Sequence, residues 1–461
     1  MKTLVFSIVI VAATFLTGCG QSSGSGVLFD GTDGGRWTTT GGATVADGVL
    51  ALHDGATAVL KSAKYKDFEL EMVLRTVSAG KGYVAFHTDA AAGKGYRVAV
   101  NNDRTDDVWW KMTGSLLSVR NLTKSFVRDG DWFTMTVRVE GQAVTVSING
   151  SPVVEYIEPT APYRVAPNEA ALLSAGTFAL VSESGDIEFK NISVIALQTD
   201  EAAVQSQLAA AGDEQNDDII RLHQEDFPVL DYHVHLKGGL TEAELAQMSR
   251  DVGINYAIAP NCGIGFPITD DAGVLAFLDS MRSQPFILAM QAEGREWVVT
   301  FSQAVRDEFD YVFTDALTFT DDKGRRTRLW MPDEVWIEDQ QKYMDLIVDR
   351  ICQVLQEPAD IYVNPCFLPE PMDKKYDEFW TEERMNKFVD AMAKSGEALE
   401  INARYKIPNK AIIQKAKAAG VKFTFGTNNG MRDLGKLEYC IEMKNACGIT
   451  AQDMYKPKIK I

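Results

Sequence analysis

Hydrophobic and polar residues alternate with a period of two through the first half of the chain. The run from Phe68 to Leu74 alternates apolar with polar side chains, and residues 134–140 and 144–148 follow the same pattern. Alternate side chains of an extended strand lie on one face, so each run predicts a strand with one buried face. Asn149-Gly150 is typical of a tight hairpin turn. Repeated strands with glycine turns between them predict an all-β sandwich over residues 27–196.

The pattern changes at residue 227. Short apolar segments now alternate with stretches whose apolar residues recur at helical spacing. We expect strands at residues 229–232, 256–259, 286–290, 311–314, 361–363, 398–401 and 423–425. We expect helices at residues 242–251, 340–355, 382–394, 410–418 and 434–444. About seven strand–helix units in succession predict an α/β barrel with parallel strands over residues 227–461.

Residues 197–226 connect these two predicted domains. The stretch 202–211 is rich in alanine, which favours a helix, and residues 213–218 are acidic and are expected to be solvated. We expect an interdomain linker without a function of its own.

The N-terminal residues have the pattern of a targeting segment. Lys2 precedes the apolar run Leu4–Phe15, which is too short for a comfortable membrane span. Leu16-Thr17-Gly18-Cys19 resembles the lipobox of bacterial lipoproteins. The resemblance implies a signal peptide over residues 1–18, cleavage before Cys19 and lipidation of the Cys19 thiol. Residues 19–26, rich in glycine and serine, then form a flexible tether to a membrane of the bacterial cell envelope, on its periplasmic or outer surface.

Composition narrows the range of partners and cofactors. A formal net charge of -18 disfavours nucleic acid and anionic membrane surfaces as ligands. Besides Cys19 the chain has five cysteines, without a C-x-x-C pair, which argues against a zinc ribbon or a thioredoxin motif. We expect most of these cysteines to be buried free thiols.

Polar side chains follow nearly every predicted barrel strand. His233 and His235 end the first strand, where they project from the same face and are spaced to hold one divalent cation. The alternative is a pair of histidines that fills a polar barrel end. Chemistry in such barrels gathers at the carboxyl ends of the strands. The other strand ends carry Asn261, Cys262, Glu293, Arg295, Glu296, Asp315, Thr318, Asn364, Cys366, Glu400, Asn402, Arg404, Thr427, Asn428 and Asn429.

The first half of the chain resembles the 3-keto-disaccharide hydrolase domain family. The matching stretches are residues 28–31, 47–50, 65–70, 82–86, 95–98, 131–133, 148–150 and 187–192. The resemblance implies a concanavalin-like jelly-roll sandwich and substrates such as 3-keto-glycosides, which are sugars oxidised at C3. Trp109 and Trp110 follow a polar loop and are candidates for an aromatic sugar platform, with ordinary packed or exposed rings as the alternative.

The second half resembles the PHP (polymerase and histidinol phosphatase) family of metal-dependent hydrolases, whose fold is a distorted seven-stranded barrel. His233-Val234-His235 matches the family's opening H-x-H, and Gly294-Arg295-Glu296 matches its later G-x-E, which implies Glu296 as a ligand. Asn364-Pro365 replaces the family's His-Pro, and residues 426–429 replace its Ser-Asp-x-His turn. With only two histidines in the barrel, the resemblance fits a divergent branch with one divalent ion, or one with none.

Together these features predict an exported carbohydrate-active hydrolase or lyase that acts on glycosides, with 3-keto-glycosides as the expected substrates. A ketone at C3 acidifies the C2 proton, so a base can remove it while a cation stabilises the enolate. The predicted roles are metal binding by His233, His235 and Glu296, base catalysis by Glu293 or Asp315, and substrate binding by Asn364, Asn402, Arg404 and Asn428.

Two alternatives remain open from the sequence. The first is a metal-dependent phosphoesterase of the PHP type, which the missing histidines disfavour. The second is a non-catalytic glycan-binding lipoprotein, which the acidic strand ends disfavour because buried carboxylates without a role are costly.

Overall fold

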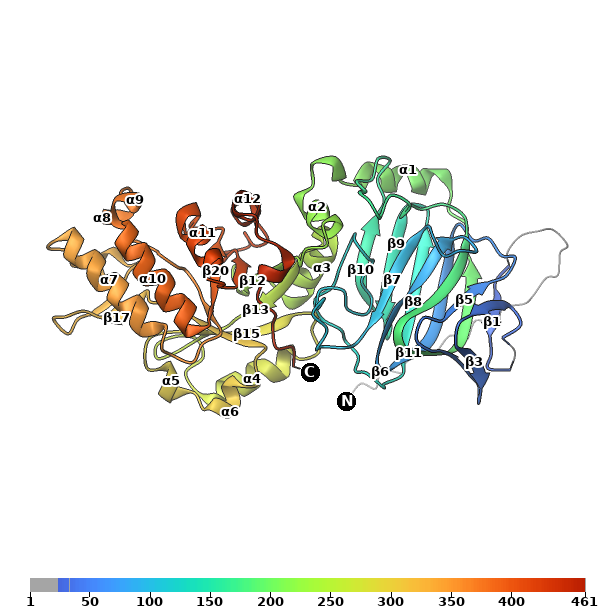
Figure 1. The fold of residues 1–461 in the computed structure, drawn as a ribbon, viewed down its shortest axis with the longest axis horizontal. Coiled ribbons are helices and arrows are strands. Elements are labelled where there is room, and N and C mark those ends of the chain that lie inside the picture. The colour runs from blue at the N-terminus through green and yellow to red at the C-terminus, as the bar shows by residue number, and fades with distance from the viewer. Residues whose placement is uncertain (1–23, 33, 461) are drawn as a thin grey trace, which may run out of the picture.

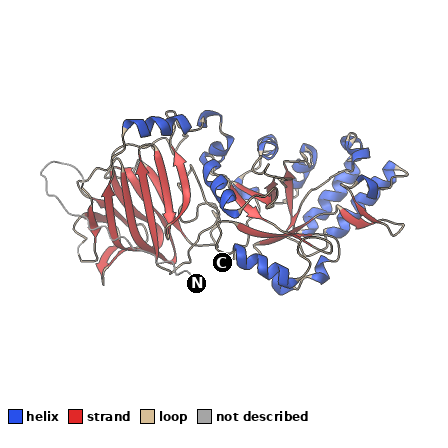
Figure 2. Ribbon diagram, turned by 180° about the vertical axis from the view of Figure 1, so that it is seen from behind, coloured by secondary structure: helices blue, strands red, loops and turns tan. Residues whose placement is uncertain are grey.

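The computed structural model describes residues 24–32 and 34–460. It contains two domains side by side, an antiparallel β-sandwich and an α/β barrel, joined by short helices (Figures 1 and 2). The predicted signal peptide, Cys19 and most of the tether lie outside the described residues. Among the described helices, none combines the length and the apolar character needed to cross a bilayer.

The sandwich is built on two long antiparallel strands. β6 (Phe68–Thr88) and β11 (Thr177–Ala196) pair along almost their full length. The other pairings are also antiparallel, in the order β10-β9-β8-β6-β11-β4-β3. The remaining strands are β1 (Gly26–Phe29), β2 (Trp37–Thr40), β3 (Ala43–Ala46), β4 (Val49–Leu52), β5 (Thr57–Leu60), β7 (Tyr96–Asn101), β8 (Phe133–Glu140), β9 (Ala143–Ile148) and β10 (Ser151–Ile157).

Alternation along the strands produces the sandwich core. In β8, the side chains of Phe133, Met135, Val137 and Val139 are buried, and the residues between them are half-buried. Each buried set faces the apolar side chains of neighbouring strands, because successive side chains point to opposite faces. The all-β sandwich predicted from the period-two pattern is confirmed.

The connection between the domains is ordered. It forms α1 (Glu201–Ala210), the 3-10 helix η1 (Glu214–Asn216) and α2 (Asp218–Gln224), so the predicted helix in the alanine-rich stretch is present. The prediction of a solvated acidic stretch is wrong for Glu214, which is buried and forms an ion pair with Arg164 at 2.8 Å. A buried carboxylate requires such a partner because desolvation disfavours its charged form.

Seven parallel strands form the second domain, in the order β12-β13-β15-β16-β19-β20-β21. The first and last strands approach each other, and the Asn428 N–H donates to the His233 carbonyl at 2.9 Å. The barrel is therefore nearly closed, as the strand–helix pattern predicts. The strands are β12 (Leu230–Val234), β13 (Asn255–Ile258), β15 (Ile287–Ala292), β16 (Tyr311–Thr314), β19 (Ile361–Tyr362), β20 (Ala398–Asn402) and β21 (Phe423–Gly426), with β14 (Asn261–Cys262) beside β15.

Helices flank the barrel strands. The first of them, α3 (Glu242–Val252), begins at a capping box between Thr241 and Glu244, which satisfies free N–H groups of its first turn. The last, α12 (Glu438–Cys447), begins four residues later than predicted, because Gly435 takes a positive φ of 73° that a helix does not accommodate. The others are α4 (Asp271–Met281), α5 (Trp297–Thr300), α6 (Gln303–Arg306), α7 (Gln340–Val354), α8 (Glu370–Asp373), α9 (Tyr376–Phe379), α10 (Glu382–Ser395) and α11 (Lys410–Ala418).

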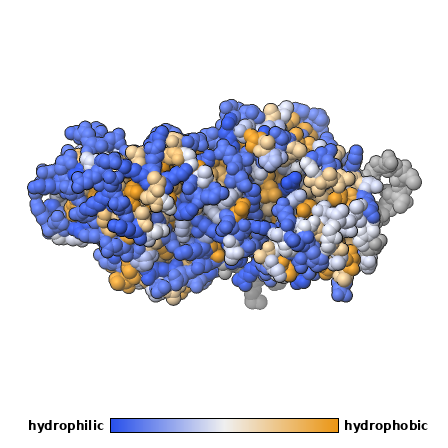
Figure 3. Space-filling model, in the orientation of Figure 1, coloured by the Kyte–Doolittle hydropathy of each residue, from blue (hydrophilic) through white to orange (hydrophobic). Residues whose placement is uncertain are grey.

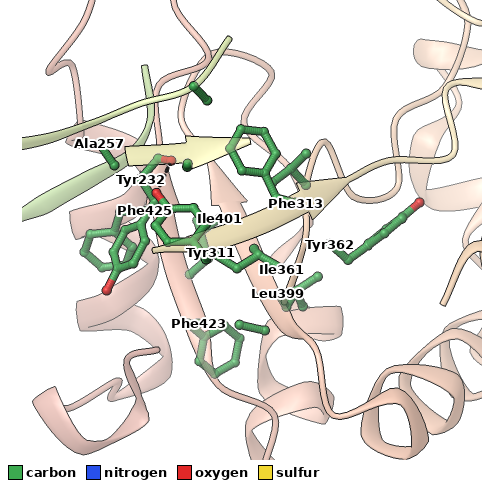
Figure 4. Close-up of a cluster of buried hydrophobic side chains, with 14 of the residues drawn as sticks. Tyr232, Ala257, Tyr311, Phe313, Ile361, Tyr362, Leu399, Ile401, Phe423 and Phe425 are labelled. Carbon is green, nitrogen blue, oxygen red and sulfur yellow. Dashed lines mark hydrogen bonds between the residues drawn. The ribbon is translucent and has the colours of Figure 1, made fainter. Parts of the chain in front are cut away.

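Aromatic and aliphatic side chains fill the barrel interior (Figure 4). The rings of Tyr232 and Tyr311 lie 5.9 Å apart, and the Tyr311 hydroxyl donates to the Tyr232 carbonyl at 2.6 Å. Ile401 and Phe425 pack in the same cluster. At or just past the carboxyl ends of the strands lie the polar side chains of His233, Glu293, Asn364 and Asn402. Beyond β16, a hairpin of β17 (Thr318–Thr320) and β18 (Arg326–Arg328) extends from the barrel.

The two domains share a buried interface. Trp109 and Trp110 of the sandwich belong to the same apolar cluster as the barrel core. Lys124 of the sandwich is buried and donates to the Phe286 carbonyl of the barrel at 2.7 Å. Apolar packing and buried hydrogen bonds together fix the orientation of one domain on the other.

Candidate functional site

His233 lies at the centre of a buried polar network at the carboxyl ends of the barrel strands. Its Nδ1 lies 2.7 Å from Oε1 of Glu400, and its Nε2 lies 3.2 Å from Oε1 of Gln291. His233 and Glu400 are fully buried, on β12 and β20 respectively. Both ring nitrogens of His233 therefore have protein partners.

Glu400 and three asparagines form the rest of this network. Glu400 Oε2 accepts from the Asn364 N–H at 2.6 Å and from Asn402 Nδ2 at 3.0 Å. The Asn364 side-chain oxygen accepts from Asn402 and from Asn428, at 3.1 Å and 2.8 Å. The structure thus brings the predicted substrate-binding amides together, but they bond to one another. Asn364 and Asn402 are buried, and Asn428 is partly exposed.

Two acidic side chains border the network. Asn364 Nδ2 donates to Asp315 at 2.9 Å, and Asn261 Nδ2 donates to Glu293 at 2.7 Å. Burial, reinforced by the charge of Asp315, raises the pKa of Glu293 to about 8. Burial also raises the pKa of Asp315. Two buried carboxyl groups that oppose each other's ionisation are suited to hold and transfer a proton at neutral pH.

The predicted metal ligands do not come together as one set. His235 Nδ1 lies 2.6 Å from the Ala259 carbonyl, while its buried Nε2 has no hydrogen-bond partner. Glu296 is exposed and accepts from the Arg295 N–H at 3.1 Å. Within residues 24–32 and 34–460, no group of three or more His, Cys, Asp or Glu side chains is arranged to hold a metal ion. These donors do not fit the predicted divalent ion, which stays a prediction from the sequence.

Removal of divalent metal tests this point. We expect dialysis against EDTA to leave the melting temperature unchanged. Both ring nitrogens of His233 already bond to protein groups, and no set of three metal-binding side chains includes His235 among the described residues. Scanning fluorimetry and elemental analysis before and after dialysis measure the outcome. An equimolar ion whose removal lowers the melting temperature, and which is lost on replacing both histidines by alanine, would contradict this expectation.

The remaining predicted site residues lie at the margins of the barrel end or away from it. Trp109 and Trp110 are only 4% and 5% exposed in the domain interface, and Trp110 Nε1 donates to Asp226 at 3.0 Å. Rings buried to this degree offer no face to a sugar, so the structure places both in a packed role. Arg404 is exposed and donates to the Asn428 carbonyl at 3.1 Å.

Glu397 is a further buried acid, and neither of its carboxyl oxygens has a hydrogen-bond partner. Burial, with smaller effects of Glu357 and Asp360, raises its pKa from 4.5 to about 8. Because folding raises this pKa, the contribution of Glu397 to the free energy of unfolding is fully present below the pKa of the unfolded chain. It is lost as pH rises through the folded pKa of about 8. We therefore expect urea denaturation midpoints to fall between pH 5 and 8, and to fall less for Glu397→Gln. Parallel pH profiles of the two proteins would disprove this assignment.

The sandwich carries a cleft of about 400 Å³ beside β6 and β7. Lys81 Nζ lies 3.1 Å from Asp106, which also accepts from Asn101 at 2.9 Å. This ion pair holds one part of the wall in place. The polar lining consists of Lys81, Lys94, Arg97, Asn101, Asp106, Lys111, Ser118, Asn168 and Glu183.

Three charged groups of the cleft are exposed and have no salt bridge among the described residues: Lys94, Arg97 and Glu183. The Arg97 guanidinium lies over the Tyr83 ring, 4.9 Å from its centroid. Burial raises the pKa of Tyr83, while Arg97 lowers it and Glu183 raises it, which places both charges near this ring. The cleft therefore offers a cation and a carboxylate to a ligand.

Sequence reasoning missed this cleft. Arg97 and Asn101 are separated by an even number of positions in β7, which places them on one face of the strand. Many solvent-facing strands carry such residues, so the signal is not specific. Asn168 and Glu183 reach the same wall from segments far along the chain, and only the fold brings them together.

Comparison with protein families identifies the sandwich. Residues 24–195 match the family of the 3-keto-alpha-glucoside-1,2-lyase-like domain. The sandwich is therefore similar to 3-keto-disaccharide hydrolase-like domains. This match supports a carbohydrate-related function and agrees with the resemblance drawn from the sequence. No curated protein matches the chain.

Solved structures that are similar to the chain cover between 35% and 40% of it. A proposed glycosyl hydrolase from Parabacteroides distasonis is 18% identical, with a TM-score of 0.34, over 38% of this chain and 94% of its own. The carbohydrate-binding module CBM66 from Bacillus subtilis is 16% identical, with a TM-score of 0.28, over 35% and 96%. The exoplasmic domain of VIP36, in a form bound to Ca²⁺ and Man3GlcNAc, is 10% identical, with a TM-score of 0.28, over 40% and 94%.

Proposed function

We propose that the protein is a carbohydrate-active lyase or hydrolase that cleaves 3-keto-glycosides in the sandwich cleft. One observation carries the proposal: the residues that match the lyase-like family also enclose the charged cleft of about 400 Å³. Ligand pockets typically measure about 300–1,000 Å³, so the cleft has the size of a small-molecule site. Among its unpaired charges, Arg97 and Glu183 supply the cation and the base that an elimination at a keto sugar requires.

The proposed reaction begins at C2 of the sugar. The C3 ketone acidifies the C2–H bond, and the Glu183 carboxylate takes this proton. Arg97 stabilises the negative charge that develops on the C3 oxygen. The C1–O bond then breaks, a C1=C2 double bond forms, and the aglycone oxygen leaves with the bonding electrons and takes a proton from Lys94. Addition of water across the double bond completes a net hydrolysis.

Product analysis tests the proposed function. A 3-keto-disaccharide and its unoxidised parent are each incubated with the full-length protein and followed by mass spectrometry. We expect cleavage of the keto sugar alone, because only its C2 proton is acidified. Cleavage of neither sugar, or equal cleavage of both, would refute the proposal.

A second location for the chemistry is the barrel end. The observation that favours it is the raised pKa of Glu293 and Asp315, which lets one carboxyl keep a proton for donation at neutral pH. Both side chains are buried, so substrate access requires the surrounding loops to open. In this case Glu293→Gln abolishes cleavage and Glu183→Gln does not. Lipid anchoring through Cys19 and a location in the bacterial cell envelope also stay proposals from the sequence.

A further inference from the structure

We infer that a groove at the carboxyl end of the barrel strands binds a neutral oligosaccharide. The groove measures about 670 Å³ and is formed by the segments that follow β18, β19 and β20. It lies on the barrel, whereas the cleft of the proposed reaction lies on the sandwich, so the two sites are independent. Its lining includes Trp330, Phe367, Glu370, Asp373, Tyr405 and Lys406.

Aromatic rings in this groove are exposed and held in place. Trp330 and Tyr405 are each 37% exposed. The Phe367 ring meets the Tyr405 ring edge to face, with centroids 5.0 Å apart. The Tyr405 N–H donates to the side chain of Asn402 at 3.0 Å, which ties this loop to the buried network of the barrel end. The Arg404 guanidinium lies over the Tyr405 ring, 5.7 Å from its centroid. Partly exposed rings in a groove are suited to stack on the C–H faces of sugars.

The groove stands out from its surroundings. The face of the molecule in Figure 3 is largely hydrophilic, with apolar side chains scattered over it. In the described barrel residues, large exposed aromatic side chains occur only at Trp330, Trp336 and Tyr405. Two of these three line one groove, and an exposed aromatic pair within a concave surface is typical of a binding site.

The charges of the groove select the class of sugar. Glu370, Asp373 and Asp377 line it, against one cation, Lys406. Asp377 accepts from Asn409 Nδ2 at 2.9 Å. Carboxylates accept hydrogen bonds from sugar hydroxyl groups, and amide groups both donate to them and accept from them. An acidic wall repels phosphate and uronate groups. The groove is therefore complementary to an uncharged oligosaccharide of hexoses.

Binding measurements on the full-length protein test this inference. The probes are the neutral trisaccharides maltotriose and cellotriose, with a uronic-acid trisaccharide as the anionic comparison, and the method is titration calorimetry. We expect at least one neutral probe to bind, and Trp330→Ala and Tyr405→Ala each to weaken its affinity about fivefold. Trp336→Ala is the matched control, because Trp336 is also 37% exposed and lies outside the groove.

The outcomes separate this site from the sandwich cleft. Unchanged affinity in both Trp330→Ala and Tyr405→Ala overturns the inference, as does tighter binding of the anionic trisaccharide or no binding of either neutral one. A third outcome is binding that is lost in Arg97→Ala and kept in both groove variants. It would assign the sugar to the cleft and would also overturn the inference. The probes are unoxidised, so failure of 3-keto-glycoside cleavage leaves this test unaffected. Melting temperatures confirm that each variant is folded.

Discussion

Replacement of Glu400 by alanine is expected to lower the free energy of unfolding by about 3–5 kcal/mol. Glu400 accepts from the side chains of His233 and Asn402 and from the backbone N–H of Asn364, all of them buried. Without the carboxylate these donors lose their acceptor and cannot reach water, so each retains an uncompensated desolvation cost. Urea denaturation followed by circular dichroism measures the change.

A surface ion pair provides the control for this prediction. Asp349 on α7 lies 2.5 Å from Lys387, and both side chains are more than half exposed. Asp349→Ala is expected to have a far smaller effect, because solvent screens an exposed pair. An effect of Glu400→Ala as small as that expected for Asp349→Ala would show that the buried network contributes little to stability.

Replacement of Glu183 by glutamine is expected to lower kcat/KM for a 3-keto-disaccharide by about 10²–10⁴, the usual contribution of a general base. Arg97→Ala is expected to lower it by about 10²–10³, because the cation that stabilises the enolate is lost. Both side chains are exposed, so neither change should unfold the protein. Initial rates at several substrate concentrations separate the effects on kcat and KM.

Glu71→Gln is the matched control for the cleft variants. Glu71 is an exposed carboxylate on β6 that does not line the cleft. We expect wild-type kinetics for this variant. Wild-type kinetics for Glu183→Gln as well would contradict the assignment of the base.

Periodicity in the sequence was sufficient to predict both folds. The alternating pattern of β8 sets which side chains are buried, and the strand–helix units of the barrel have local start signals such as the Thr241 cap. Predicted barrel strands agree with the structure to within two residues at their ends; β16 at residues 311–314 agrees fully. Where a boundary was missed, as at α12, a single glycine conformation decided it.

The site was less predictable because it depends on which side chains bond to each other. The sequence placed His233, Asn364 and Asn402 at strand ends, which is correct, but it did not show that Glu400 satisfies all three. The tryptophan pair followed a polar loop, and only the packing of the second domain shows that it is buried. In the same way, Glu183 comes to line the same cleft as Arg97 only when the sandwich forms.

The most direct test of the proposed chemistry is the origin of the C2 hydrogen in the released sugar. The reaction is run in D₂O with a 3-keto-disaccharide and read by NMR at early times, with the free keto sugar as a control for spontaneous exchange. We expect solvent deuterium at C2 with the wild type and with Glu293→Gln, and none above the control with Glu183→Gln. Cleavage that leaves the original hydrogen at C2, or incorporation that Glu293→Gln abolishes and Glu183→Gln retains, would contradict it.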